Sequence, residues 1–291
     1  MKSPSDRYKI IQELHQQGYS ISLLCKTLGA SQSGYYESLK RKLSVTKQRR
    51  EGMKDKVKML FLKHKKRYGR IRIHRDLLAQ GIKISEKMVG SIMRDLGLKA
   101  IAKRAFRPKT TISSAHANPI EDLVKGKVFT CPNQCLFGDI TYVATKEGWL
   151  YLSGFIDAYS KMIKGYSIEE SMPASLVTGS LEKALKRFPK LKEAIIHSDR
   201  GSQYTSHCYH QMLTQHGLKI SMGQKGVCYD NAVIESFWST LKTECFPSSG
   251  VFETKAEAKA AIFEYIESYY NTQRRHSSLN YRFPLAAELA A

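Results

Sequence analysis

The 291-residue chain has no long hydrophobic run. A helix that crosses a membrane needs about 20 mostly apolar residues, and no stretch of even about 18 is present. The first residues, Met1-Lys2-Ser3, do not begin the charged-then-apolar pattern of a secretion signal. We therefore expect a protein without membrane contact that works in the cytoplasm.

Cysteine is scarce, with 6 residues scattered along the chain. Cys131 and Cys135, and separately His207, Cys208 and His210, have the spacing of half a zinc site. Neither group has a second pair at zinc-finger spacing, so we predict no structural zinc. Because we expect a reducing compartment, we do not expect these cysteines to form disulfides.

Basic charge is concentrated in the N-terminal third. The whole chain has 47 Lys and Arg against 26 Asp and Glu; residues 1–110 hold 28 and 8 of these, and residues 111–291 hold 19 and 18. Such a region can neutralise phosphates and release their counterions, so a polyanion is the expected partner. For a short run such as residues 63–67, a basic surface that only keeps the protein soluble is the alternative.

The start of this basic region predicts a helix-turn-helix. Residues 22–28 form a helical run, Gly29 breaks it, and Ser31 caps a second helix that begins at Gln32. A recognition helix in this position presents its side chains to a DNA groove. Its candidate DNA-binding residues are Gln32, Ser33 and Tyr36.

A similar pattern recurs at residues 68–97, where Gly81 ends one helix and Ser85 caps the next. A basic linker is predicted to follow at residues 101–130. The candidate DNA-binding residues of this module and linker are Arg72, Arg75, Lys87, Arg94, Lys103 and Arg104. Small helical bundles that only contact other proteins share the pattern, which leaves that alternative open.

Three acidic residues stand in unlike local contexts. Asp139 lies in a β-branched and aromatic run, residues 136–143, followed by a turn and a second strand-like run. Asp199 directly follows a short buried strand, which aims it at the edge of a sheet. Glu235 lies on an amphipathic helix at residues 232–244. Taken alone, each residue is more often a helix cap or a solvated surface group.

Together the three carboxylates have a defined chemistry. Mg²⁺ prefers oxygen ligands, keeps several waters and is completed by substrate phosphates. If the three side chains converge, they indicate a metal-dependent enzyme that acts on phosphodiesters. Lys242 lies seven positions after Glu235 on the same helix face, where it can contact DNA that enters the site.

Several motifs around these residues resemble one protein family. Residues 197–204 (HSDRGSQY) and 228–238 (CYDNAVIESFW) resemble signatures of bacterial insertion-sequence transposases of the IS-three family. Residues 138–142 (GDITY), 269–271 (YYN) and 274–279 (RRHSSL) match further family motifs. The resemblance covers nearly the whole chain and is to the second-frame product, OrfB, whose DDE core belongs with retroviral integrases.

The resemblance implies an α/β fold, with an RNase H-like mixed-sheet catalytic core preceded by small all-α helix-turn-helix modules. We expect an N-terminal helix-turn-helix at 1–44, a second module at 45–100 and a basic linker at 101–130. The integrase catalytic core is expected at 131–248, and a C-terminal helix with a basic tail at 249–291. That helix is predicted to pack on the core through one apolar side.

The resemblance also implies the activity, a DNA transposase that cleaves and joins strands at insertion-sequence ends. Asp139, Asp199 and Glu235 would hold two Mg²⁺ ions about 3.5–4 Å apart, with Mn²⁺ as a substitute. The implied DNA contacts of this part of the chain are Lys242, Arg200, Lys225, Arg274 and Arg275. The implied DNA is double-stranded, at terminal inverted repeats and at the target, on the bacterial nucleoid.

Family membership further implies a homo-oligomer on DNA. No sustained heptad repeat precedes residue 21, which fits a product that receives its dimerising part from an upstream frame, OrfA. Two alternatives remain open. One is a catalytically limited DNA-binding regulator of transposition, and the other is a hydrolytic RNase H-like nuclease that never joins strands.

Overall fold

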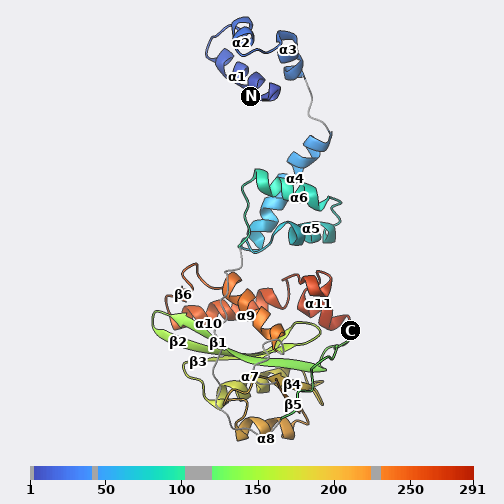
Figure 1. The fold of residues 1–291 in the computed structure, drawn as a ribbon, viewed down its shortest axis with the longest axis vertical. Coiled ribbons are helices and arrows are strands. Elements are labelled where there is room, and N and C mark those ends of the chain that lie inside the picture. The colour runs from blue at the N-terminus through green and yellow to red at the C-terminus, as the bar shows by residue number, and fades with distance from the viewer. Residues whose placement is uncertain (1–2, 41–44, 102–119, 224–230) are drawn as a thin grey trace. The chain divides into compact units, whose positions relative to one another are not determined.

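The computed structural model describes residues 3–40, 45–101, 120–223 and 231–291 (Figure 1). The chain forms two compact units, one of residues 1–60 and 87–98 and the other of residues 61–86 and 99–291. Most of the predicted linker is outside the described residues, as are three predicted DNA contacts. These three are Lys103, Arg104 and Lys225.

The first unit begins with α1 (Pro4–Gln16), α2 (Ile21–Thr27) and α3 (Gln32–Lys40). Ser3 begins α1 with a capping box: its hydroxyl accepts from the backbone N–H of Asp6, whose carboxylate accepts from the backbone N–H of Ser3. The small core consists of Ile11, Leu24, Cys25 and Tyr35. The predicted helix pair is confirmed by α2 and α3, whereas α1 was not anticipated.

The next helices are α4 (Val45–Lys63), α5 (Arg70–Ala79) and α6 (Glu86–Asp95). The second predicted helix pair is confirmed by α5 and α6, and α4 is an addition to it. Within the first unit, Arg50 of α4 forms an ion pair with Asp95 of α6. The buried residues of α6 are Val89, Ile92 and Met93.

Within the described residues, the second unit holds a mixed sheet of six strands in the order β3-β2-β1-β4-β5, with β6 paired to β1. The strands are β1 (Cys135–Thr145), β2 (Gly148–Asp157), β3 (Ile163–Glu169), β4 (Ile195–Ser198), β5 (Lys219–Met222) and β6 (Val251–Phe252). The first three form an antiparallel meander, as predicted. Strands β4 and β6 run parallel to β1, and β5 runs parallel to β4.

Helices cover both faces of this sheet (Figure 1). One face carries α7 (Ala174–Arg187) and α8 (His207–Gln215); the other carries α9 (Ala232–Glu244), α10 (Lys255–Phe263) and α11 (Pro284–Leu289). The predicted helices at 174–187 and 232–244 are confirmed by α7 and α9. In the described parts of the chain, no helix combines the length and apolar composition that crossing a membrane requires.

The core between the sheet and α7 is closely packed. A Cβ at Gly165 of β3 would lie 2.3 Å from the backbone oxygen of Ser180, so only glycine lets the helix approach. The cluster includes Leu136, Phe155, Val177, Leu181 and Ile196, all fully or almost fully buried. Burying an aliphatic or Phe side chain contributes roughly 1.5–3 kcal/mol. This packing fixes β1 and β4 side by side, and these two strands carry or precede Asp139 and Asp199.

The C-terminal region packs on the core, as predicted. After α10 the chain continues in a π-helix at Glu264–Tyr270, a 3₁₀ turn at Ser277–Leu279, and then α11. The predicted apolar side is buried, and its members are Ala258, Ile262, Tyr265, Ile266 and Tyr269. The π-helical geometry of the second half has no counterpart in the predicted pattern.

Candidate active site

Asp139 lies on β1 opposite Gly154 of β2. Trp238 of α9 reaches this point, where its indole Nε1–H donates to Asp139 Oδ2 at 2.9 Å. Gly154 leaves room for the indole, because a Cβ there would lie 3.0 Å from the ring. Sequence reasoning missed this hydrogen bond, since Trp238 fits the apolar stripe of its helix and nothing in the pattern marks a polar role.

Asp199 follows β4, the parallel neighbour of β1. The strand register pairs Phe137 with His197, so Asp139 and Asp199 each stand two residues further along their own segments. The Asp199 Oδ1 atom accepts from the backbone N–H of Gly201 at 2.9 Å, which closes a tight turn and orients the carboxylate. The two aspartates thus extend from neighbouring strands in the same direction.

Glu235 comes from a later part of the chain, where it lies in the first turn of α9. The start of this helix is tied to β1, since Asn231 Nδ2 donates to the backbone oxygen of Gly138 at 3.3 Å. Glu235 is exposed, and partial burial raises the pKa of its carboxyl group. The contacts of Asn231 and Trp238 hold α9, and therefore Glu235, over the strand that carries Asp139.

The electrostatics of Asp139 reflect these neighbours. Burial raises its pKa to about 7, and the carboxylates of Asp199 and Glu235 push it in the same direction. The backbone N–H of Ile140 and the indole of Trp238 partly oppose the rise. The three acidic residues therefore interact through space, although they are far apart in the sequence. Like charges near a partly buried carboxylate disfavour its ionised form.

Lys242 lies on the same helix as Glu235, two turns further on. Burial lowers the pKa of its ammonium group, and attraction to Asp139 works against this change. The side chain is therefore within electrostatic range of Asp139, and its contact with DNA stays a prediction.

The donor set fits a divalent cation chemically. Among the described residues, no group of three His, Cys, Asp or Glu side chains is arranged as a ready metal site. Mg²⁺ does not require such a group, since it keeps waters and takes one or two carboxylates together with substrate phosphates. The mutual repulsion at Asp139 is the kind of interaction that a cation relieves. Full convergence of the three side chains stays a prediction.

The predicted DNA contacts fall into two groups. Those on α3, Gln32, Ser33 and Tyr36, are exposed, and Tyr36 retains 48% of its accessible surface. Lys87 and Arg94 of α6 are also exposed, as is Arg75 of α5. The Arg75 guanidinium also lies over the ring of Tyr281, 4.8 Å from its centroid. Exposure leaves these side chains accessible to a partner and does not identify it.

The other group is engaged within the protein. Arg274 is 4% exposed, and its guanidinium donates to both carboxylate oxygens of Glu244 at 2.7 and 2.8 Å. Arg72 lies 3.9 Å from the same carboxylate. Arg275 pairs with Asp76 and donates to the backbone oxygen of Tyr281. Contact of DNA with Arg274 does not fit this structure, because its charge is already neutralised inside the fold.

Arg200 is also engaged in the structure. Its guanidinium donates to the backbone oxygens of Gly223 at 3.0 Å and Ile120 at 3.2 Å. These bonds fasten the ends of two segments beside the Asp199 turn. The arginine therefore supports the site from within, which its position after Asp199 in the motif did not indicate.

Comparison with known families agrees with this architecture. Residues 130–228 match an integrase core domain, residues 216–284 match a second integrase core domain model, and residues 47–106 match an HTH-like domain. The matches and the mixed sheet confirm the predicted fold class. They define a polynucleotidyl transferase of the transposase and integrase class, whose partner is DNA.

Similarity to individual proteins is more specific. The chain is 40% identical over 269 residues to the transposase InsF for insertion sequence IS3A of Escherichia coli K12, covering 91% of this chain and 92% of that protein. It is 40% identical over 265 residues to an uncharacterized 31 kDa protein of insertion element IS600 from Shigella sonnei, covering 90% and 96%. The chain belongs to the IS3 family of transposases.

Similarity to solved structures is more distant. The chain matches a simian T-cell lymphotropic virus intasome complex with the PP2A regulatory subunit B56 gamma at a TM-score of 0.46 and 15% identity, over 80% of this chain and 73% of that one. It matches the HTLV-2 integrase catalytic core domain in complex with magnesium at a TM-score of 0.39 and 14% identity, over 54% and 97%.

Proposed function

We propose that Asp139, Asp199 and Glu235 are the catalytic carboxylates of this transposase and hold two Mg²⁺ ions, with Mn²⁺ as a substitute. The main support is the pKa of Asp139, which is raised to about 7 by burial and by the other two carboxylates. Perturbed groups of this kind concentrate at functional sites. A bound cation would lower this pKa and keep Asp139 ionised at neutral pH.

Two of the three carboxylates are held by hydrogen bonds within the fold. The Trp238 indole fixes one oxygen of Asp139, and the Gly201 N–H fixes one oxygen of Asp199. When bound, divalent ions supply an activated water or 3′-hydroxyl and stabilise the leaving oxygen of an in-line displacement. Lys242 places positive charge near Asp139, where it attracts the phosphate of the DNA strand.

The proposed substrates are the terminal inverted repeats of an insertion sequence and a target DNA, both double-stranded. The relatives named as IS3 transposases support this choice. The exposed residues on α3, α5 and α6 are the proposed contacts of the helical modules. We extend the proposal to the predicted domain boundaries, to a multimer on DNA in the cytoplasm at the nucleoid, and to an upstream-frame OrfA partner.

The test neutralises one carboxylate at a time. Asp139→Asn and Glu235→Gln keep the size of the side chain and remove its charge, so end cleavage and strand joining should fall at least about 10³-fold, in line with a lost metal ligand. DNA binding in a mobility-shift assay should remain. The matched control is Glu182→Gln on α7, an exposed carboxylate that forms an ion pair with Lys186.

Three outcomes separate the alternatives. Full cleavage by Glu235→Gln would refute the assignment of this residue. Cleavage without strand-joined products would favour a hydrolytic nuclease. Absence of Mg²⁺-dependent cleavage in the wild-type chain, together with retained binding, would favour a DNA-binding regulator, and adding the upstream-frame product would then show whether the activity depends on it.

A further inference from the structure

A basic pocket lies close to the carboxylate site, in the second unit. It has a volume of about 640 Å³ and is lined by the segment before β1, the β2–β3 loop and the chain around the 3₁₀ turn. Its charged lining residues are Lys125, Lys127, Lys161 and Arg282. Ligand sites commonly measure about 300–1,000 Å³, so the space exceeds what a single small anion needs.

The positive lining is a local property. Residues 111–291 hold 19 basic and 18 acidic side chains, so this part of the chain is almost neutral. Among the described residues that line the pocket, every charged side chain is nevertheless a cation, and none is Asp or Glu. Charge of one sign in a concave site focuses its field and attracts ligands of opposite charge.

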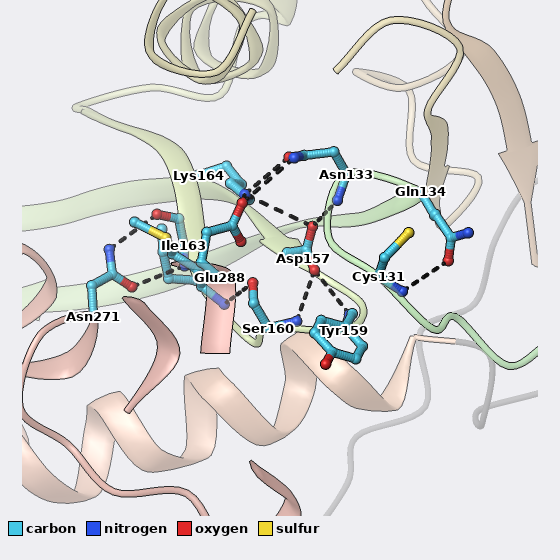
Figure 2. Close-up of polar contacts among 11 residues, drawn as sticks. Cys131, Asn133, Gln134, Asp157, Tyr159, Ser160, Ile163, Lys164, Asn271 and Glu288 are labelled. Carbon is cyan, nitrogen blue, oxygen red and sulfur yellow. Dashed lines mark hydrogen bonds and ion pairs between the residues drawn. The ribbon is translucent and has the colours of Figure 1, made fainter. Parts of the chain in front are cut away.

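The neighbouring acidic groups are turned inward and occupied. Figure 2 shows Asp157 accepting from the backbone N–H groups of Tyr159, Ser160 and Asn133. In the same cluster, the Lys164 ammonium donates to Glu288 at 2.5 Å. Asp157 attracts the Lys161 ammonium through space, and the hydrogen bonds of these two carboxylates are made to groups other than the pocket cations.

Asp122 is occupied in the same manner, close to the other wall of the pocket. Its Oδ1 atom accepts from the backbone N–H groups of Val124 and Lys125 at 3.0 and 3.1 Å. These bonds shape the turn that presents Lys125 and Lys127. The carboxylate thus acts on the backbone of the segment and leaves the lysine side chains directed to solvent.

The cations themselves are available. Lys125, Lys127 and Arg282 are exposed, and within the described residues their side chains make no hydrogen bond or salt bridge to another residue. Lys161 is held more firmly, since its ammonium donates to the backbone oxygen of Ala158 at 2.5 Å. The pocket thus combines one hydrogen-bonded ammonium with three exposed cationic side chains whose donors are open to a ligand.

The pocket adjoins both elements that carry proposed catalytic residues. Phe137 lines it and lies two residues before Asp139 on β1, so both side chains share one face of the strand. Val233 also lines it and lies in the same first turn of α9 as Glu235. A chain molecule seated in the pocket would therefore extend toward the carboxylates.

We propose that this pocket binds the sugar–phosphate backbone of a DNA strand that continues beyond the proposed active site. Phosphates along a strand match the spaced cations, and the partly exposed ring of Tyr159 provides a face on which a base can stack. The direction of the strand rests on the proposed function, whereas the binding itself rests on the pocket alone.

The test measures the affinity of the full chain for a short fluorescein-labelled single-stranded oligonucleotide by anisotropy, in EDTA. The double variant Lys127→Glu with Arg282→Glu should bind about tenfold more weakly. Its salt dependence should lose about 1.4 from the slope of log K against log[salt], because two strand phosphate contacts of about 0.7 each are removed. The conservative double variant Lys127→Arg with Arg282→Lys should bind like the wild type.

A matched charge control accounts for the basic N-terminal region. Lys190→Glu with Lys192→Glu introduces the same charge change at exposed positions between α7 and β4, outside the pocket lining. An equal loss of oligonucleotide affinity in both charge-reversed double variants would overturn the proposal. Displacement of the oligonucleotide by polyglutamate at equal charge concentration would overturn it as well, in favour of an acidic peptide.

This test is independent of catalysis. The assay contains no divalent cation and none of the altered residues is a proposed catalytic group, so an active Asp139→Asn enzyme would refute the catalytic assignment and leave the affinity result unchanged. Unaltered unfolding midpoints for the charge-reversed variants establish that the loss is one of binding, since these exposed side chains hold nothing in place.

Discussion

Asp139 and Asp157 both belong to the β1–β2 hairpin, but their carboxylates have opposite surroundings. Asp157 accepts several backbone N–H groups and lies 3.9 Å from the buried ammonium of Lys164, which also binds Glu288 (Figure 2). Asp139 accepts from the indole of Trp238 and the backbone N–H of Ile140, and it faces two other carboxylates. The protein supplies a cation beside the first carboxylate, whereas the proposed function supplies one beside the second.

The comparison distinguishes a carboxylate with a structural role, Asp157, from one with a proposed functional role, Asp139. A buried carboxylate that only stabilises a fold is expected to have its charge and lone pairs satisfied within the protein. Asp157 follows this rule, and its cluster joins α11 to the sheet, because Glu288 lies on α11 and Lys164 on β3. Asp139 departs from the rule at the place where the family motifs lie. Repulsion of this kind is typical of functional sites.

The largest effect on stability should follow removal of the buried cation. Lys164→Met leaves Asp157 and Glu288 without their ammonium partner in a fully buried position, so unfolding free energy should fall by about 3–5 kcal/mol. Denaturant unfolding measures the change. Lys186→Met, an exposed lysine of α7, is the control and should change stability by less than about 0.5 kcal/mol. Equal stability of Lys164→Met and Lys186→Met would contradict the structural role given to the Asp157 cluster.

The second prediction concerns pH in metal-free buffer. The pKa of Asp139 is about 7 in the folded chain against an ordinary value of 3.8, so the native state holds more protons than the unfolded state between these values. Wild-type stability should therefore fall relative to Asp139→Asn as pH rises from about 4 to about 7, by on the order of a few kcal/mol.

Unfolding free energies of the two proteins across this pH range provide the measurement. Below about pH 4 the difference should disappear, because the carboxyl group is then protonated in both states. Added Mg²⁺ at pH 8 should restore part of the wild-type stability and leave the variant unchanged. Parallel pH curves for the two proteins would contradict the raised pKa.

A smaller effect is expected at the indole that supports Asp139. Trp238→Phe keeps an aromatic ring and removes the Nε1–H donor, which should cost about 1.5 kcal/mol of stability because the lost bond is to a carboxylate. The pKa of Asp139 should rise further, and the acid limb of the cleavage profile should move to higher pH. Trp149→Phe is the control, since Trp149 is 56% exposed on the same hairpin. Identical pH profiles for both variants would exclude this role of Trp238.

Much of the fold was predictable where local patterns are strong. The alternating and β-branched runs predicted β1, β2 and β3, and the apolar stripe predicted α9 with its bounds. The strand β5, Lys219–Met222, was missed because four residues of mixed polarity carry too little periodicity. The helix α1 was missed for a similar reason, since it has a modest apolar side and is completed by packing against its neighbours.

Prediction of the site was limited by contacts between distant residues. Motif similarity identified Asp139, Asp199 and Glu235 as candidates, but the Trp238 hydrogen bond depends on the space left by Gly154 on another strand. Arg274 was interpreted as a DNA contact because it lies in a basic motif. Its buried partner Glu244 is on α9, and nothing near Arg274 in the sequence reveals that pairing. Ion pairs of this kind are set by tertiary structure.

Electron paramagnetic resonance can measure the binding of Mn²⁺ to the full chain at pH 8. This measurement tests the shared carboxylate site independently of catalytic turnover. We expect the wild type to bind Mn²⁺ and Asp139→Asn, Asp199→Asn and Glu235→Gln each to bind it at least about tenfold more weakly, with Glu182→Gln unchanged. Wild-type affinity in all three neutralised variants would contradict a common cation site.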